Sequence, residues 1–193
     1  LLSRGLGDVY KRQEKYCQYV DEGYTDVIHV PINRSGSSTY NNAVMAQGML
    51  REERPEHHLN IHLLDPHTYS MVFGWYLCEM ARKLQNGAEL RHVISEFETQ
   101  MNKMEVILGP YSLKQMKKSG RISAAAAVMG ELMGIRPIIT LIDGKTRVES
   151  KVRGDDKVIP AMIDLCKKRT EGVEDFDYIC LLYTSDAADE EDS

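Results

Sequence analysis

The chain has 193 residues, of which 42% are hydrophobic and 27% are charged. These proportions allow a folded core in one large domain or two small ones, and they are typical of a globular protein. The formal net charge of −5 argues against nucleic acid as the main partner, because phosphate binding requires a basic face. No apolar run approaches the length of a membrane-spanning helix, so we expect no transmembrane segment.

The cysteines and histidines give no sign of a metal site. The four cysteines form no CxxC pair, and two of them fall in apolar stretches where a free thiol acts as a small hydrophobe. His58 and His62 are four residues apart, but no third ligand accompanies them. The opening Leu1-Leu2 is not followed by the apolar region of a signal peptide. We therefore expect a reducing, cytoplasmic setting, with no metal and no cofactor.

The two ends of the chain do not continue the patterns beside them. Residues 1–13 (LLSRGLGDVYKRQ) and 180–193 (CLLYTSDAADEEDS) resemble translated sequencing-adapter strings. We expect both to be non-native tails, which leaves residues 14–179 to carry the fold. Native tails are the alternative interpretation.

Residues 14–110 alternate between strand and helix patterns. Strands are expected at 26–32, 59–64 and 105–108, and helices at 39–53, 70–85 and 88–104. This order predicts an α/β domain with a mostly parallel, Rossmann-like sheet covered by helices. The helix at 70–85 begins with apolar residues on almost every face, which predicts that it is buried or lines a cavity.

The pattern changes after Gly109-Pro110. Short helices are expected at 111–118 and 124–133, strands at 137–142 and 146–152, and a helix at 158–168 with Pro160 in its first turn. Asp143-Gly144 between the two strands is a strong hairpin signal. An antiparallel hairpin after a parallel unit predicts a second, smaller α/β domain over residues 111–179.

One polar loop stands out as a candidate ligand site. Asn33-Arg34-Ser35-Gly36-Ser37-Ser38-Thr39 lies between a predicted strand and a predicted helix, where open α/β sheets bind ligands. Its hydroxyls can cap the helix, and the free backbone N–H groups at a helix start favour an anion. The loop matches neither a P-loop nor a GxSxG nucleophile elbow. An ordinary serine-rich capping loop remains the alternative.

Two arginines are further candidates. Arg121 lies between a glycine and an apolar residue at the predicted domain junction, and Arg153 follows the predicted hairpin. An arginine can hold a carboxylate or a phosphate with its planar fork. A surface arginine in a basic turn and a solvated strand end are the respective alternatives.

Three segments in order resemble the DegV family over roughly residues 14–178. They are DVIHVPINRSGSSTYNNA, LKQMKKSGRIS and GIRPIITLIDGKTRVESKVRG. Ser38 and Ser119 stand where the family usually has glycine, and Asp65-Pro66 departs from its Asp-Ser. The family's earlier Thr/Ser loop and its later His-containing segment would lie before residue 14 and after residue 178. The resemblance thus implies a DegV-like two-domain fold that is incomplete here.

The resemblance also implies a function. It is that of the fatty-acid-binding subunit of bacterial fatty acid kinase, a non-enzymatic carrier that presents a long-chain fatty acid to an ATP-dependent kinase subunit. Ser37, with Ser38 and Thr39 beside it, matches the hydroxyl region at the fatty acid carboxylate, and Arg121 matches a basic residue near it. Arg153 matches an arginine used toward the kinase partner. Transient membrane contact is compatible with such a role.

Two other classes of function remain open from the residues. A serine hydrolase or transferase could use Ser35 or Ser37 as nucleophile, but it would need a general base beside the loop. A regulatory domain that binds a sugar or phosphate could share the α/β plan. A wet, basic pocket would favour that third interpretation over a long apolar one.

Overall fold

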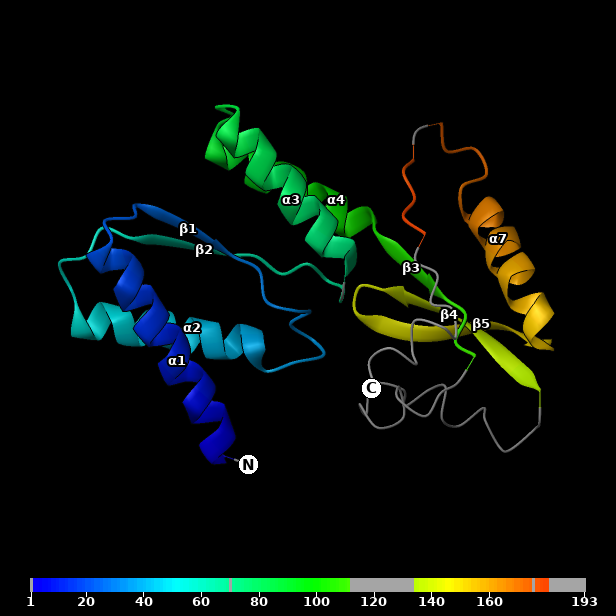
Figure 1. The fold of residues 1–193 in the computed structure, drawn as a ribbon, viewed down its shortest axis with the longest axis horizontal. Helices are drawn as coiled ribbons and strands as arrows, with labels where there is room; N and C mark the ends of the chain where they lie inside the picture. Colours follow the sequence, from blue (N-terminus) through cyan, green and yellow to red (C-terminus); the bar gives the residue numbers. More distant parts are fainter. Residues whose placement is uncertain (1, 70, 112–133, 175, 181–193) are drawn as a thin grey trace, which may run out of the picture.

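The computed structural model describes residues 2–69, 71–111, 134–174 and 176–180 of the chain. Within them lie two β-sheets and five α-helices, at α1, α2, α3, α4 and α7 (Figure 1). The first sheet is parallel and two-stranded, and the second is antiparallel and three-stranded. The predicted α/β class with a parallel sheet followed by an antiparallel hairpin is confirmed.

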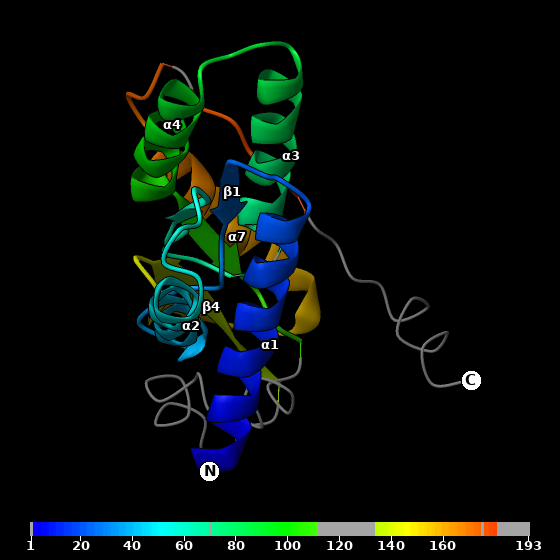
Figure 2. The same ribbon diagram turned by 90° about the vertical axis from the view of Figure 1, so that its left-hand side faces the viewer.

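The parallel sheet carries two helices on one side. Strand β1 (Asp26–His29) pairs with β2 (Asn60–Leu63), and helix α2 (Thr39–Glu53) connects them. Helix α1 (Leu2–Asp21) packs beside α2, as the view in Figure 2 also shows. Apolar side chains from these elements form one buried cluster of Val9, Tyr16, Ala46, Leu50 and Leu59.

Residues 2–13, predicted to be a tail, are continuous with the rest of α1. Val9 is only 1% exposed and belongs to the buried cluster, so residues ahead of position 14 contribute to the core. Helix α1 can run through because its apolar side recurs at helical spacing from Val9 to Tyr16. That the segment is non-native stays a prediction, since packing does not report on origin.

Helices α3 (Met71–Gln85) and α4 (Leu90–Lys103) form a helical hairpin. The predicted stripe on α4 is confirmed, because Val93, Phe97 and Met101 are buried against α3. The sequence predicts that α3 is buried or lines a cavity, and burial does not hold for two large side chains near its start. Met71 is 64% exposed and Trp75 is 42% exposed, so one face of this helix is open in the described part of the chain.

The second sheet has the order β3-β4-β5 and is antiparallel throughout. Strands β4 (Ile135–Ile142) and β5 (Lys145–Arg153) are joined by Asp143 and Gly144, both with positive φ (48° and 71°). This is the geometry of a type I′ turn, which confirms the predicted hairpin. Helix α7 (Val158–Arg169) follows a short 3-10 turn, η1 (Asp155–Lys157), and packs against this sheet with Pro160 in its first turn.

The sequence predicts that strand β3 (Glu105–Leu108) completes the parallel sheet, but in the structure it does not. It pairs antiparallel with β4, with Glu105 opposite Ile142. A four-residue apolar strand carries no signal of its direction, and the long β4 offers it a complete edge. Close packing at Gly109 holds the chain there, since an added Cβ would overlap Met162 and Val158 of α7. The helices expected over 111–118 and 124–133 fall on residues 112–133, apart from residue 111, and these lie outside the described residues.

Candidate ligand-binding site

Two loops meet at the carboxyl ends of the parallel strands. Residues 30–38 follow β1 and residues 64–69 follow β2, and the parallel register of the strands brings the loops together. The Asn33 N–H donates to the Thr68 carbonyl (3.1 Å). One carboxylate oxygen of Asp65 accepts the backbone N–H groups of Arg34 (3.2 Å) and His67 (3.0 Å). Asp65 therefore fixes both loops in one arrangement.

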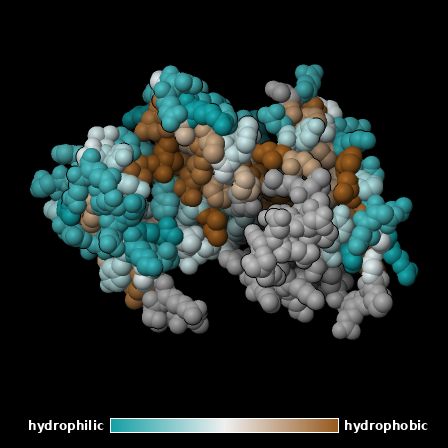
Figure 3. Space-filling view, in the orientation of Figure 1, coloured by the Kyte–Doolittle hydropathy of each residue, from teal (hydrophilic) through white to brown (hydrophobic). Residues whose placement is uncertain are grey.

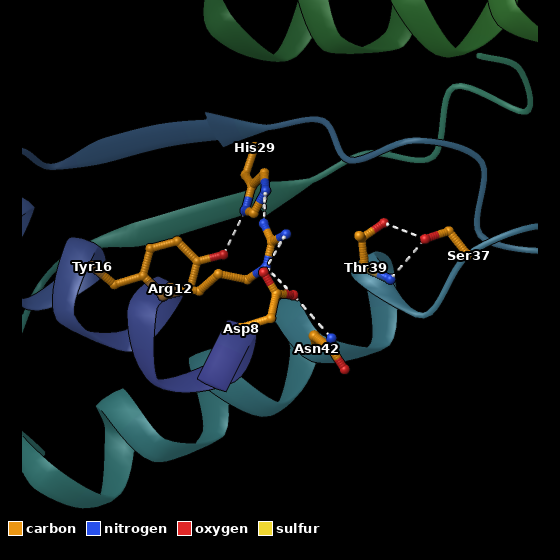
Figure 4. Close-up of polar contacts among 7 residues, drawn as sticks. All are labelled: Asp8, Arg12, Tyr16, His29, Ser37, Thr39 and Asn42. Atoms are coloured by element: carbon orange, nitrogen blue, oxygen red, sulfur yellow. Dashed lines mark hydrogen bonds and ion pairs between the residues drawn. The ribbon is translucent and has the colours of Figure 1, made fainter. Parts of the chain in front are cut away.

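The hydroxyl groups predicted for the site lie at the first turn of α2 (Figure 4). Ser37 Oγ accepts the Thr39 N–H (3.2 Å) and the Thr39 hydroxyl (3.1 Å). Ser38 occupies the N-cap position but makes no side-chain cap. The structure thus brings Ser37 and Thr39 together at a helix N-terminus, which favours an anion through the helix dipole and its free N–H groups.

A buried asparagine and a tyrosine stiffen the loop ahead of Ser37. Asn33 is 1% exposed, and its Oδ1 accepts both the Ser35 N–H (2.9 Å) and the Ser35 hydroxyl (3.0 Å). Its amide nitrogen donates to the Tyr69 hydroxyl (3.4 Å), and a Cβ at Gly36 would overlap that same hydroxyl. Only glycine at position 36 allows this approach, so the two loops are fitted to each other.

The tip of the β4–β5 hairpin, which belongs to the second sheet, contacts the loops of the candidate site. His67 Nδ1 lies 3.0 Å from a carboxylate oxygen of Asp143. A Cβ at Gly144 would overlap Asn33 Nδ2 and would lie 2.7 Å from Ser35 Oγ. His67 and Asp143 both have positive φ (53° and 48°), a rare conformation for residues with a side chain. The turn therefore contacts the loop that leads to Ser37.

An apolar stripe begins beside the two loops. Met71, Trp75 and Cys78 are exposed on α3 and lie at i, i+4 and i+7, which places them on one face of the helix. Figure 3 shows apolar side chains gathered over this part of the molecule. Exposed apolar side chains in a contiguous patch mark a binding surface more often than chance. Here the patch starts where the polar loops end.

The two candidate arginines are not joined to this site by the described structure. Arg121 lies outside the described residues. Arg153 is exposed at the far end of β5, eight residues beyond Lys145 at the turn. At about 3.3 Å per residue that separation is roughly 26 Å along the strand. Any role of Arg153 is thus separate from the Ser37 loop.

A second polar cluster lies on the parallel sheet (Figure 4). His29 on β1 is contacted through Nε2 by the Arg12 guanidinium (2.9 Å) and through Nδ1 by the Tyr16 hydroxyl (2.5 Å). Asp8 pairs with Arg12 (3.0 Å) and accepts from Asn42 (2.9 Å). Because a guanidinium only donates, Nε2 must accept, which assigns the proton of the neutral ring to Nδ1.

Burial controls the protonation of this second cluster. Burial, together with the nearby Arg12 cation, lowers the pKa of His29 from 6.5 to about 4, and burial raises the pKa of Tyr16 to about 12. The hydrogen bond from Arg12 lowers the pKa of Asp8. A neutral His29 between a cation and a phenol is a structural element of the sheet and its helices rather than part of the Ser37 site.

The described residues support neither of two other chemistries. Among the described residues, the Ser37 and Ser35 hydroxyls form hydrogen bonds with Thr39 and Asn33, neither of which is a general base. In the described ranges, no group of three His, Cys, Asp or Glu side chains could hold a metal ion.

No helix among the described segments is long and apolar enough to cross a membrane.

Sequence reasoning missed the second loop. Thr68 and Tyr69 contact the Asn33 loop through backbone and side chain, yet neither was singled out. The available signal was the strand–helix–strand order itself, because parallel strands place both following loops at one edge. The hairpin turn was predicted, but its contact with Asn33 joins residues more than a hundred positions apart and has no local signal.

Comparison with known proteins gives a consistent family. A family model described as "Uncharacterised protein, DegV family" matches residues 8–192. A DegV domain-containing protein of Clostridium perfringens is 28% identical over 185 residues, covering 95% of this chain and 63% of that protein. A DegV domain-containing protein of Clostridium acetobutylicum is 30% identical, covering 82% of this chain and 56% of that protein. The chain therefore spans between half and two thirds of the length of these relatives.

Solved structures show the same fold. A stearic acid-binding protein from Eubacterium ventriosum superposes with a TM-score of 0.75 at 23% identity, covering 86% of this chain and 56% of that one. A fatty acid binding DegV family protein from Streptococcus agalactiae gives a TM-score of 0.69 at 26% identity, covering 84% and 56%. The match of the family model over nearly the whole chain, together with this shared architecture, places the chain in the DegV family.

Proposed function

We propose that this protein binds a long-chain fatty acid without transforming it. The observation that carries the proposal is a pair of polar loops followed along the chain by an exposed apolar stripe. Ser37 and Thr39 stand at the N-terminus of α2, and the stripe of Met71, Trp75 and Cys78 on α3 begins two residues after Tyr69, which contacts the loop ahead of Ser37. The Streptococcus agalactiae relative, which binds fatty acid, supports the assignment.

The energetics favour the alkyl chain as the main source of affinity. Each buried methylene contributes about 0.8 kcal/mol, so a sixteen-carbon chain supplies roughly 10 kcal/mol before entropic costs. A charge-assisted hydrogen bond to the carboxylate adds about 1.5–3 kcal/mol. The stripe from Met71 to Cys78 extends roughly 10 Å along the helix at 1.5 Å per residue. It can therefore cover part of such a chain, while the Ser37 loop sets its orientation.

Trp75 offers a direct test, because it is the only tryptophan in the chain and lies on the stripe. Titration with palmitate should move Trp75 emission to shorter wavelength as the side chain is covered. Hexadecanol, which has the tail but no carboxylate, should bind more weakly. Glucose 6-phosphate, which represents the phosphate- or sugar-binding alternative, should leave the emission unchanged. An unchanged spectrum with palmitate and a shift with the sugar phosphate would reverse the assignment.

The proposal extends to a partner that carries out the chemistry. We propose that an ATP-dependent fatty acid kinase subunit phosphorylates the bound carboxylate, and that Arg153 contacts that subunit. Its exposed position, far from the Ser37 loop along β5, suits a contact with a partner. Arg153→Glu should lower acyl phosphate formation by the kinase while leaving palmitate binding intact. Arg147→Glu, on the same strand and also exposed, is the matched control and should change neither.

A further inference from the structure

Thr68 carries an unsatisfied hydroxyl at the site. It is 3% exposed, and its Oγ1 has no hydrogen-bond partner within the part of the chain that the structure describes. Two other buried polar atoms share that condition, but each has an ionic partner. Glu105 Oε1 lies 3.4 Å from Arg169, and Arg136 Nε lies 2.7 Å from Asp155. Buried hydroxyls are normally paired, so Thr68 needs an explanation.

The position of Thr68 ties it to the head-group loop. Its carbonyl accepts the Asn33 N–H (3.1 Å), and the next residue, Tyr69, places its hydroxyl against Gly36, directly before Ser37. Thr68 thus belongs to the β2 loop at the same edge of the sheet as the N-terminus of α2. Both loops therefore lie at the edge of the sheet where the helix N-terminus favours an anion.

Its polar neighbours are already engaged. Asn33 Oδ1 accepts two hydrogen bonds from Ser35, and its amide donates to Tyr69. The carboxylate of Asp65 accepts the N–H groups of Arg34 and His67. The Thr68 hydroxyl has no hydrogen-bond partner among the described residues, so it has a proton to give, and a carboxylate can only accept.

We propose that Thr68 Oγ1 is a further ligand contact, which donates its proton to a carboxylate oxygen of the bound fatty acid. This inference rests on the proposed function. The donor remains unpaired until the ligand arrives, so the hydrogen bond is gained in the complex and not exchanged for one within the protein. Thr68 then helps distinguish a fatty acid from the corresponding alcohol, together with the hydroxyls of α2.

Two buried threonines make a matched pair for the test. Thr140 is 0% exposed, but its hydroxyl donates to Glu149 (2.8 Å). Thr68→Val and Thr140→Val would be compared by urea unfolding without ligand and by palmitate titration followed through Trp75. Thr68→Val should keep or raise the unfolding midpoint and weaken palmitate binding about ten-fold. Thr140→Val should lower the midpoint and leave the affinity unchanged.

Further variants separate the outcomes. Thr68→Ser, which retains the hydroxyl, should bind palmitate as wild type does, and the smaller Thr68→Ala should repeat the loss if valine is too bulky. Wild-type affinity in both Thr68→Val and Thr68→Ala would overturn the role of Thr68 while leaving the proposed function standing. A wild-type protein that binds no palmitate would overturn both proposals.

Discussion

The two sheets differ in strand length and in the length of the segments that follow their strands. Strands β1 and β2 have four residues each, and their carboxyl ends lead into two polar loops that hold the candidate site. Strands β4 and β5 have eight and nine residues and are joined by only two, with β4 buried from Pro137 to Leu141. The tip of this hairpin contacts the loops of the short sheet, through Asp143 with His67 and through Gly144 with Asn33. The loops of the short sheet are thus held by contacts from the longer one.

The largest expected effect, on the unfolding free energy, comes from disrupting the contact between the hairpin turn and the Asn33 loop at Gly144. Gly144→Ala adds a Cβ that overlaps Asn33 in a residue with φ of 71°. Gly87→Ala is the control, because Gly87 also has positive φ (85°) but has nothing within 4 Å of the added Cβ. Urea unfolding should show a loss of about 1–2 kcal/mol for Gly87→Ala from backbone strain alone, and a larger loss for Gly144→Ala. Equal losses of unfolding free energy in the two variants would show that the contact between the turn and the loop does not contribute to stability.

The second effect concerns the parallel sheet alone. The pKa of His29 is about 4 in the folded protein, against its ordinary 6.5, mainly because the ring is buried. Between these values the unfolded chain binds a proton that the folded protein does not, so the unfolding free energy should fall as the pH decreases from about 6.5 to about 4. His29→Gln should flatten this dependence when urea unfolding is repeated across that range. The exposed His92→Gln should leave it as in wild type.

The third prediction compares an exposed methionine on the apolar stripe of α3 with an exposed methionine outside it. Met71→Gln places a polar amide at the start of the apolar stripe, and Met45→Gln makes the same change at an exposed position of α2 (64% and 51% exposed). We expect Met71→Gln to weaken palmitate binding by about 1–2 kcal/mol, because it removes apolar area covered by the alkyl chain. Calorimetric titration would measure it. A similar loss for Met45→Gln would indicate that the stripe has no special role.

The smallest effect is expected for the head-group hydroxyl. Ser37→Ala removes one hydrogen-bonding group and should weaken palmitate binding roughly 3–10-fold, which is less than the change at Met71. Ser95→Ala, at an exposed position of α4, is the control and should bind as wild type does. If the Ser37 variant lost more affinity than the Met71 variant, the carboxylate rather than the tail would dominate binding.

Much of the architecture could be predicted because its signals are local. Apolar spacing placed α2, α4 and α7, and Asp143-Gly144 predicted the turn because both positions need positive φ. The pairing of β3 could not be predicted, since four apolar residues fit a parallel or an antiparallel edge equally well. Whether Met71 and Trp75 are buried could not be predicted for a related reason, because hydrophobicity does not distinguish a face packed against protein from one that lines a cavity or is exposed.

The candidate site was predictable only on one side. The loop with Ser37 and Thr39 has a composition typical of a helix start at a strand end, and the structure places it there. The loop with Thr68 becomes relevant only through the register that sets Asp26 beside Asn60. The contact of Gly144 with Asn33 depends on how the two sheets pack. The roles of Ser37, Ser38, Thr39, Arg121 and Arg153 toward ligand and partner stay predictions.

The most direct test of the account is native mass spectrometry of the chain expressed in bacteria, before and after extraction with organic solvent. The account predicts an added mass equal to one long-chain fatty acid, lost on extraction and restored when palmitate is supplied. A mass that matches the bare chain before extraction and remains so after palmitate is added would contradict it.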